Sequence, residues 1–325
     1  MWDDKNIIFL ISMPRSGSTL LQRVLAGHTD INTTSESWLL LPQLYALQEE
    51  GVFSEYSHIT SSRAITDFCE CLPGQKMVYL NIIKQAIIDC YKASTKDNAQ
   101  FYLEKTPRNN LILKDICSMF PNSKYIFLWR NPAAIVASMI SSFSGGKWNI
   151  YRQEIDLYKG LKNMLDADNL NIKYRYDLKY EDLATSPSVV TTELFHFLGL
   201  STSSTDKRGL GEVSLLGRMG DKSGVHEYKK ISTLSLDKWQ SSFSNTLRQR
   251  WLKSYLNDIG SENLSKMGYS KSDLMKAISS IEPGTQSLFS DFIRMTYGVL
   301  DARYQISLIR RLRKQNKGKI KYVLQ

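Results

Sequence analysis

The sequence predicts a doubly wound α/β fold, in which a central parallel sheet is flanked by helices, with a helical extension at the C-terminal end. Two apolar runs, Ile7–Ser12 and Lys124–Trp129, are almost uninterrupted, as expected of parallel strands buried on both faces. Helical segments separate these runs, and strands alternating with helices are typical of three-layer α/β proteins. We expect one domain over residues 1–270 and a helical, basic extension over residues 271–325.

The other elements follow from local signals. A helix at Leu20–Ala26 is expected to end near Gly27, and residues 50–100 are expected to be mostly helical around an irregular Pro73-Gly74. Asn131-Pro132 is a cap residue followed by proline, which favours a helix start. Further predicted elements are strands at Phe101–Leu103 and Ile172–Leu178 and helices at Leu111–Phe120, Val189–Leu198, 245–259 and 271–313. Residues 201–235 are polar and predict a long loop over a ligand.

Composition indicates the class of protein but says little about the chemistry of a site. The chain has 325 residues, 42% of them hydrophobic, which supports a full core. The net charge of +10 comes largely from the segment after Asp301, where every charged residue is basic, so overall charge says little about a site. The four cysteines lack metal-ligand spacing and are expected to be reduced. The N-terminal apolar run is too short for a spanning helix or signal peptide, so a cytoplasmic protein is expected.

The loop from Ser12 to Thr19 is the first candidate binding site. A strand that ends in a small-residue turn at a helix start can bind an oxyanion with its backbone N–H groups and the helix dipole. Compared with the P-loop pattern, Gly17 and Thr19 fit, whereas Ser18 replaces the phosphate lysine. The loop therefore predicts a P-loop-NTPase-like fold that binds a phosphate-bearing nucleotide without using it as a triphosphate.

Arg130 is the second informative position. In P-loop ATPases a later strand usually ends in an acidic residue that helps to hold magnesium, whereas this strand ends in a fixed cation. A cation at the carboxyl end of a parallel strand favours a second phosphate over a metal. Ser138 lies on the same helical face as Asn131 and is within reach of that anion. The alternative is an arginine paired with a surface carboxylate.

Five blocks in order carry a family resemblance: Pro14–Leu21, Lys105-Thr106-Pro107, Lys124–Ser138, Tyr180–Leu183 and Phe197–Gly199. Over residues 5–260 the chain resembles the sulfotransferases, and it is most similar to their bacterial and tyrosylprotein-sulfotransferase-like branch. The resemblance implies 3′-phosphoadenosine-5′-phosphosulfate (PAPS, product PAP) as the donor and no required metal.

The resemblance also implies roles for single residues. It assigns the 5′-phosphosulfate to the loop residues Arg15, Ser16, Gly17, Ser18 and Thr19. It assigns the 3′-phosphate to Arg130 and Ser138. Tyr180 is expected near the nucleotide, and Lys229 matches a nucleotide-contacting lysine of the tyrosylprotein branch.

Sulfuryl transfer needs a base, a cation for the leaving oxygen and in-line placement. Glu36 follows Arg15 at the offset of the catalytic glutamate in the tyrosylprotein branch and is the predicted base; the alternative is a cap for the next helix. Lys105 matches the family lysine near the transferring sulfonate, and its alternative is a solvated loop lysine. None of the histidines is preferred to Glu36, namely His28, His58, His196 and His226.

The acceptor site is expected within residues 38–100 and 141–155. Two or three of the aromatic residues there are expected to line a pocket, drawn from Trp38, Tyr45, Phe53, Tyr56, Phe143, Trp148 and Tyr151. Trp38 stands where the tyrosylprotein branch has an arginine suited to acidic peptides. A hydroxyl of a carbohydrate or small molecule is therefore the first choice of acceptor, an amine the second, and a protein tyrosine the alternative.

Two alternative functions can be compared with the sequence, a small-molecule kinase and a membrane-surface binder. A nucleoside or small-molecule kinase needs a P-loop lysine and a magnesium carboxylate, and the sequence has neither at the matching positions. The basic C-terminal helix predicts at most a weak contact with a membrane surface, the alternative being a terminal helix docked by its apolar side. No nucleic-acid partner is expected.

Overall fold

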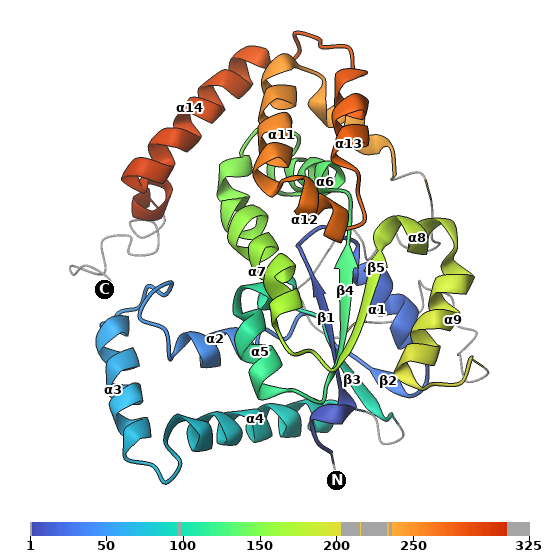
Figure 1. The fold of residues 1–325 in the computed structure, drawn as a ribbon. Coiled ribbons are helices and arrows are strands. Elements are labelled where there is room, and N and C mark those ends of the chain that lie inside the picture. The colour runs from blue at the N-terminus through green and yellow to red at the C-terminus, as the bar shows by residue number, and fades with distance from the viewer. Residues whose placement is uncertain (1, 96–98, 203–214, 216–232, 234–235, 311–325) are drawn as a thin grey trace.

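The computed structural model describes residues 2–95, 99–202, 215, 233 and 236–310. A five-stranded sheet with the order β2-β3-β1-β4-β5 forms its centre, and every strand pair is parallel (Figure 1). The strands are β1 (Ile7–Ser12), β2 (Ile31–Asn32), β3 (Phe101–Glu104), β4 (Lys124–Trp129) and β5 (Tyr174–Lys179). This topology confirms the predicted α/β fold.

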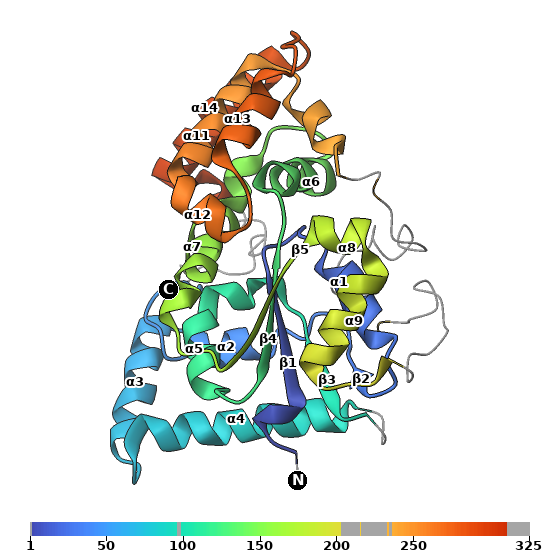
Figure 2. The ribbon, with the colours of Figure 1, turned by 45° about the vertical axis from the view of Figure 1, so that its right-hand side comes forward.

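Alternation along β1 divides the core into two layers. Ile7 and Phe9 belong to one buried cluster, and Ile8 belongs to the other, because successive side chains of a strand point to opposite faces. One face is covered by α1 (Ser18–Ala26), α8 (Tyr180–Thr185) and α9 (Pro187–Leu198). The opposite face is covered by α4 (Gln75–Ala93), α5 (Leu113–Met119) and α7 (Leu161–Leu165) (Figure 2). Both faces of the sheet are therefore covered, as the apolar runs predicted.

The middle of the chain follows the helical prediction with small shifts. Helices α2 (Leu40–Tyr45) and α3 (His58–Glu70) precede α4, and the break before α4 falls at Gly74, which has a φ of +91°. The helix predicted at Leu111–Phe120 is α5, and a 3-10 helix, Pro107–Ile112, precedes it. The strand predicted at Ile172–Leu178 is β5, which begins and ends slightly later.

In the described part of the chain after residue 245, α11 to α14 lie above the carboxyl ends of the strands, next to α6 (Pro132–Ser144). They are α11 (Thr246–Ile259), α12 (Ser261–Lys266), α13 (Lys271–Ser279) and α14 (Leu288–Tyr304). The described part of the segment 271–313, expected to be helical, holds the two helices α13 and α14 with a break between them. The break follows from Pro283, which disfavours helical backbone at the preceding residue, and there the Gly284 N–H bonds to the Ser244 carbonyl.

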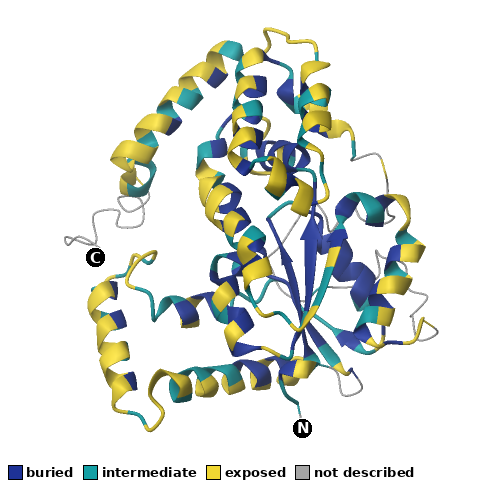
Figure 3. Cartoon of the chain, viewed as in Figure 1, coloured by how far each residue is buried: buried dark blue, intermediate teal, exposed yellow. Residues whose placement is uncertain are grey.

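A buried ion pair attaches α14 to the rest of the molecule. Arg248 Nε donates to Asp291 Oδ2 at 2.6 Å, and both side chains are more than nine-tenths buried. Elsewhere α14 and α3 are largely exposed, in contrast to the buried strands (Figure 3). Within the described residues no helix is long and apolar enough to cross a bilayer. The domain division at residue 270, the cytoplasmic location and the membrane contact stay predictions, and most of 201–235 and of the basic end lies outside the described residues.

Candidate active site

The loop between β1 and α1 has a shape that its sequence dictates. Gly17, the residue before α1, has a φ of +90°, in the left-handed region that glycine adopts without strain. A Cβ at this position would lie 2.3 Å from Cδ2 of Tyr180, so the ring of Tyr180 excludes any larger residue. The first N–H groups of α1 have no intrahelical partners and are available to an anion, together with the positive end of the helix dipole.

Arg130 reaches this loop from the end of β4. Its side chain is buried, its Nη1 donates to the Arg15 carbonyl at 2.8 Å, and its guanidinium lies 4.3 Å from the centre of the Tyr180 ring. Its Nε has no hydrogen-bond partner among the described residues. Arg130 is thus aimed at the loop and is not paired with a surface carboxylate, which was the alternative interpretation.

Ser138 lies on the same side of the loop. Its Oγ accepts a hydrogen bond of 3.1 Å from Arg15 Nε, so α6 and the loop are joined directly. The start of α6 is fixed by Glu181, which accepts from the Asn131 N–H at 3.0 Å and from the Tyr269 hydroxyl at 2.6 Å. Burial, together with the nearby Glu181 carboxylate, raises the pKa of Tyr269, so this hydroxyl stays a donor.

Glu36 and Lys105 form an ion pair at the other end of the loop. Lys105 Nζ donates to Glu36 Oε1 at 3.1 Å, and Trp38 Nε1 donates to Glu36 Oε2 at 3.2 Å. The Lys105 side chain is only 2% exposed, so it is not the solvated lysine of the alternative interpretation. Helix α2 begins at Leu40 without a side-chain cap, so Glu36 does not serve as its cap.

A second carboxylate, Glu104, accepts hydrogen bonds from residues next to Glu36 and Lys105 in the chain. Ser37 Oγ donates to Glu104 Oε2 and Thr106 Oγ1 donates to Glu104 Oε1, each at 2.7 Å. The Trp38 N–H in turn donates to Thr106 Oγ1 at 3.3 Å. Burial raises the pKa of Glu104, while its hydrogen bonds oppose that shift. Ser37 and Trp38, the two residues that follow Glu36, are therefore tied to the end of β3 and to the residues just after it.

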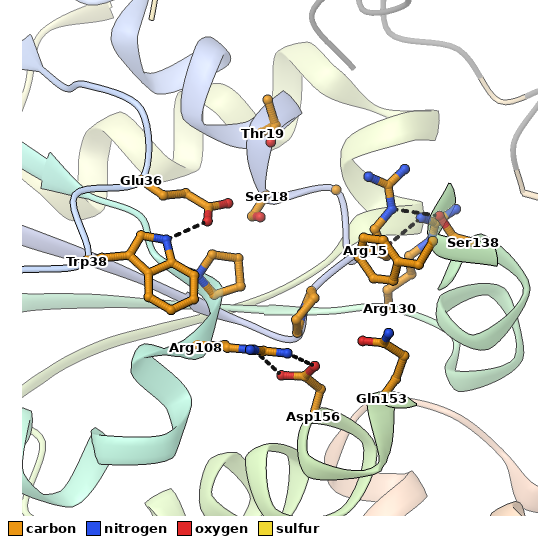
Figure 4. A pocket seen from close by; sticks show the side chains of 14 residues that line it. Arg15, Ser18, Thr19, Glu36, Trp38, Arg108, Arg130, Ser138, Gln153 and Asp156 are labelled. Carbon is orange, nitrogen blue, oxygen red and sulfur yellow. Dashed lines mark hydrogen bonds and ion pairs between the residues drawn. The ribbon is translucent and has the colours of Figure 1, made fainter. Parts of the chain in front are cut away.

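The loop, Glu36, Arg130 and Ser138 line one cavity of about 250 Å³ (Figure 4). Pro14 and Pro107, from two of the family blocks, and Gln153, from the expected acceptor range 141–155, complete its wall together with Arg108 and Asp156, which the sequence analysis did not select. Arg108 Nε and Nη2 donate to the two carboxylate oxygens of Asp156 at 3.1 Å and 3.0 Å. Arg108 directly follows the Lys105-Thr106-Pro107 block, which is a signal for it, whereas nothing local indicates Asp156.

Of the aromatic residues predicted for the acceptor site, some line the cavity and others do not. Trp38 and Phe143 line the cavity, two of the seven residues proposed. Trp148 is instead 1% exposed, packed edge-on against Phe243 and Trp251 in the core. Phe53 and Tyr56 are exposed away from the described lining.

Two of the histidines, His28 and His58, make structural contacts to backbone carbonyls. His28 Nε2 lies 2.9 Å from the Ser201 carbonyl, and His58 Nε2 lies 2.9 Å from the Gln48 carbonyl. His196 is exposed on α9. Lys229 and His226 lie outside the described residues. Over the described parts of the chain, no group of three or more His, Cys, Asp or Glu side chains is placed to hold a metal ion.

Comparisons with known proteins show which family this chain resembles. Residues 7–204 match the model of the family described as "Sulfotransferase family". Nodulation protein NoeE of Sinorhizobium fredii is 33% identical over 138 residues, 42% of this chain and 32% of NoeE. Protein-tyrosine sulfotransferase 2 of Gallus gallus is 25% identical over 246 residues, 72% of this chain and 62% of that protein. The chain thus spans less than two thirds of the length of these relatives.

Two solved structures are similar in fold. The sulfotransferase domain from the Synechococcus PCC 7002 olefin synthase has a TM-score of 0.51 at 27% identity, covering 74% of this chain and 91% of that domain. The sulfotransferase domain from the curacin biosynthetic pathway has a TM-score of 0.52 at 22% identity, covering 82% of this chain and 98% of that domain.

Proposed function

The chain belongs to the sulfotransferase family, and from this premise we propose that it transfers the sulfuryl group of PAPS to a hydroxyl of a carbohydrate or small-molecule acceptor without a required metal. One observation carries the proposal: the anion-binding loop, Arg130 and Glu36 all line the same cavity. A nucleotide held by the first two would present its reactive end to the third.

The residues of the donor half fit a doubly phosphorylated nucleotide. Ser16 Oγ and Arg130 Nε are buried polar atoms without a hydrogen-bond partner in the described structure, and such atoms usually have one. Gly17 lets the Tyr180 ring pack directly against the loop, where any side chain would collide with it. We assign the 5′-phosphosulfate to Arg15–Thr19, the 3′-phosphate to Arg130 and Ser138, and the neighbourhood of the nucleotide to Tyr180. Lys229 stays a proposed nucleotide contact on the resemblance alone.

The catalytic roles are assigned to the Glu36–Lys105 pair. PAPS supplies an activated sulfuryl group when bound. Glu36 is positioned by Lys105 and Trp38 and accepts the proton of the attacking hydroxyl. Lys105, which is buried and paired with Glu36, is assigned the stabilisation of negative charge that grows on the leaving oxygen.

Charge on the acceptor side favours an uncharged acceptor. Among the described lining residues outside the donor half, Arg108 is neutralised by Asp156 and Glu36 by Lys105. Trp38 offers an aromatic face, which suits the apolar face of a sugar ring or a small aromatic molecule. An acidic peptide would meet no uncompensated cation there. The similarity to protein-tyrosine sulfotransferases keeps a tyrosyl acceptor as the second candidate.

A transfer screen with sulfur-labelled PAPS over sugars, phenols, alcohols, amines and tyrosyl peptides tests the proposal. We expect transfer to a hydroxylated small molecule or carbohydrate and tight binding of PAP in calorimetry. Transfer confined to tyrosyl peptides would favour the second candidate. Tight binding of Mg-ATP together with indifference to PAP would overturn the donor assignment and favour a kinase.

A further inference from the structure

The pair of Arg108 and Asp156 forms a fixed hydrogen-bonding group in the wall of the cavity. Two parallel N–H···O bonds of 3.1 Å and 3.0 Å hold the guanidinium to the carboxylate in the bidentate geometry that most restricts an arginine. Asp156 is fully buried, whereas the Arg108 side chain is 38% exposed. The carboxylate is therefore the support, and the guanidinium is the part that faces the cavity.

The fork leaves donors of Arg108 unused. A guanidinium carries five N–H groups, and Asp156 takes one from Nε and one from Nη2. Nη1 has no partner among the described residues, although the side chain lines the cavity. Because Asp156 cancels the charge of Arg108, the remaining N–H groups suit a neutral oxygen better than an anion.

The backbone around Asp156 also has an unusual conformation. Asp156 belongs to a π-helical turn, Ile155–Gly160, and such turns are rare and frequently lie at functional sites. Gln153, at the end of the preceding 3-10 helix, lines the same wall. Figure 4 shows Arg108, Asp156 and Gln153 on one side of the cavity, with Glu36 and Ser18 on the other. A ligand between the two walls would meet Glu36 on one side and polar groups on the other.

We propose that Arg108, positioned by Asp156, is a specificity residue that donates hydrogen bonds to a second oxygen of the acceptor, adjacent to the hydroxyl that is sulfated. This inference rests on the proposed function and names its substrate class: ring compounds with neighbouring hydroxyl groups, such as pyranosides. Trp38, whose indole binds Glu36, offers the face on which such a ring packs. A phenol or a simple alcohol has no second oxygen for Arg108.

The experiment compares the wild type with Arg108→Ala and Arg108→Lys on methyl pyranosides and on their monodeoxy analogues. We expect Arg108→Ala to raise the KM for the preferred pyranoside about 10- to 100-fold, the effect of one lost charge-assisted hydrogen bond, with kcat within about threefold. The wild type should discriminate against the deoxy analogue that lacks the second oxygen, and Arg108→Ala should not. Arg108→Lys cannot form the fork and should fall between them.

Three readouts keep the result interpretable. Arg152→Ala is the matched control, because Arg152 is an exposed arginine close in sequence to Asp156 whose Nε bonds to Tyr151, outside the cavity lining. Calorimetry with PAP checks the fold of each variant, and saturation-transfer NMR in the presence of PAP measures pyranoside binding independently of turnover. Asp156→Asn, which keeps the shape but weakens the fork, should loosen the same discrimination.

The possible results are decisive in different ways. Unchanged discrimination in a folded Arg108 variant overturns the inference, as does wild-type transfer to phenols or alcohols with no binding of any pyranoside. Loss of PAP binding in Arg108→Ala, with Arg108→Lys unaffected in discrimination, also overturns it. Failure of the wild type to bind PAP would instead overturn the proposed function.

Discussion

The two halves of the cavity are built in different ways. On the donor side, consecutive loop residues from Arg15 to Thr19 meet Arg130 at the tip of the neighbouring strand, and the shape comes from backbone conformation. On the acceptor side, two ion pairs join residues 69 and 48 positions apart, Lys105 with Glu36 and Arg108 with Asp156. The donor half is therefore specified by short sequence motifs and the acceptor half by tertiary pairing, so one can stay fixed while the other is altered.

The largest effect is expected for Glu36→Gln, which tests whether the acceptor half of the cavity can be changed without the donor half. Removal of the proposed base should lower turnover by about two to four orders of magnitude, because the hydroxyl proton loses its acceptor. PAP affinity should stay within about threefold, since the donor half is untouched. Single-turnover kinetics and calorimetry measure the two effects. Glu49→Gln, whose carboxylate pairs with Arg63 on the surface, is the control, and near-normal turnover in Glu36→Gln would place the base elsewhere.

Arg130→Ala should have the opposite signature. Loss of a buried cation facing a phosphate should weaken PAP binding about 100-fold, while the KM for the acceptor changes little. The control is Arg175→Ala, because Arg175 lies on the adjacent β5 and packs 4.4 Å from the Phe127 ring without lining this cavity. Equal losses for donor and acceptor would contradict the division of the cavity.

Gly17→Ala tests the backbone component of the donor half. The added methyl would collide with the Tyr180 ring, so the loop must shift, and we expect PAP affinity to fall about tenfold at a cost of about 1–3 kcal/mol in stability. Gly146→Ala has a similar positive φ, +82°, but nothing within 4 Å of the new Cβ, so it separates strain from the collision. PAP titrations and thermal unfolding of both variants distinguish these causes.

Excess chelator should have the smallest effect of all. Transfer from PAPS should continue at an unchanged rate in EDTA, because Lys105 and the loop are assigned the charge stabilisation that magnesium provides in kinases. The measurement is PAP release with and without the chelator. Abolished transfer that returns with added magnesium would count against the assignment.

The sequence predicted the donor half better than the acceptor half for a physical reason. The loop, Arg130 and Ser138 sit at strand ends and on a helix face, and the geometry of a parallel sheet brings such positions together. Arg108 and Asp156 come into contact only because the 3-10 helix Pro107–Ile112 packs against the π-helical turn. Trp148 shows the same limit, since its aromatic character alone could not separate core from cavity.

Some missed features did have local signals. Pro283-Gly284 indicates the break between α13 and α14, which the prediction of helix over residues 271–313 did not include. The bond from Tyr269 to Glu181 had none, because it joins residues 88 positions apart. Long-range polar contacts of this kind fix the start of α6 and therefore the place of Ser138.

Arg15 is a non-glycine residue with a φ of +69°, a conformation that costs about 1–2 kcal/mol. Its carbonyl bond to Arg130 and its side-chain bond to Ser138 offset that cost before any nucleotide arrives. The binding loop is consequently preorganised, so a ligand that enters it spends little of its affinity on reshaping protein. A substitution at position 15 would remove the side-chain bond to Ser138 but keep the backbone carbonyl that accepts from Arg130.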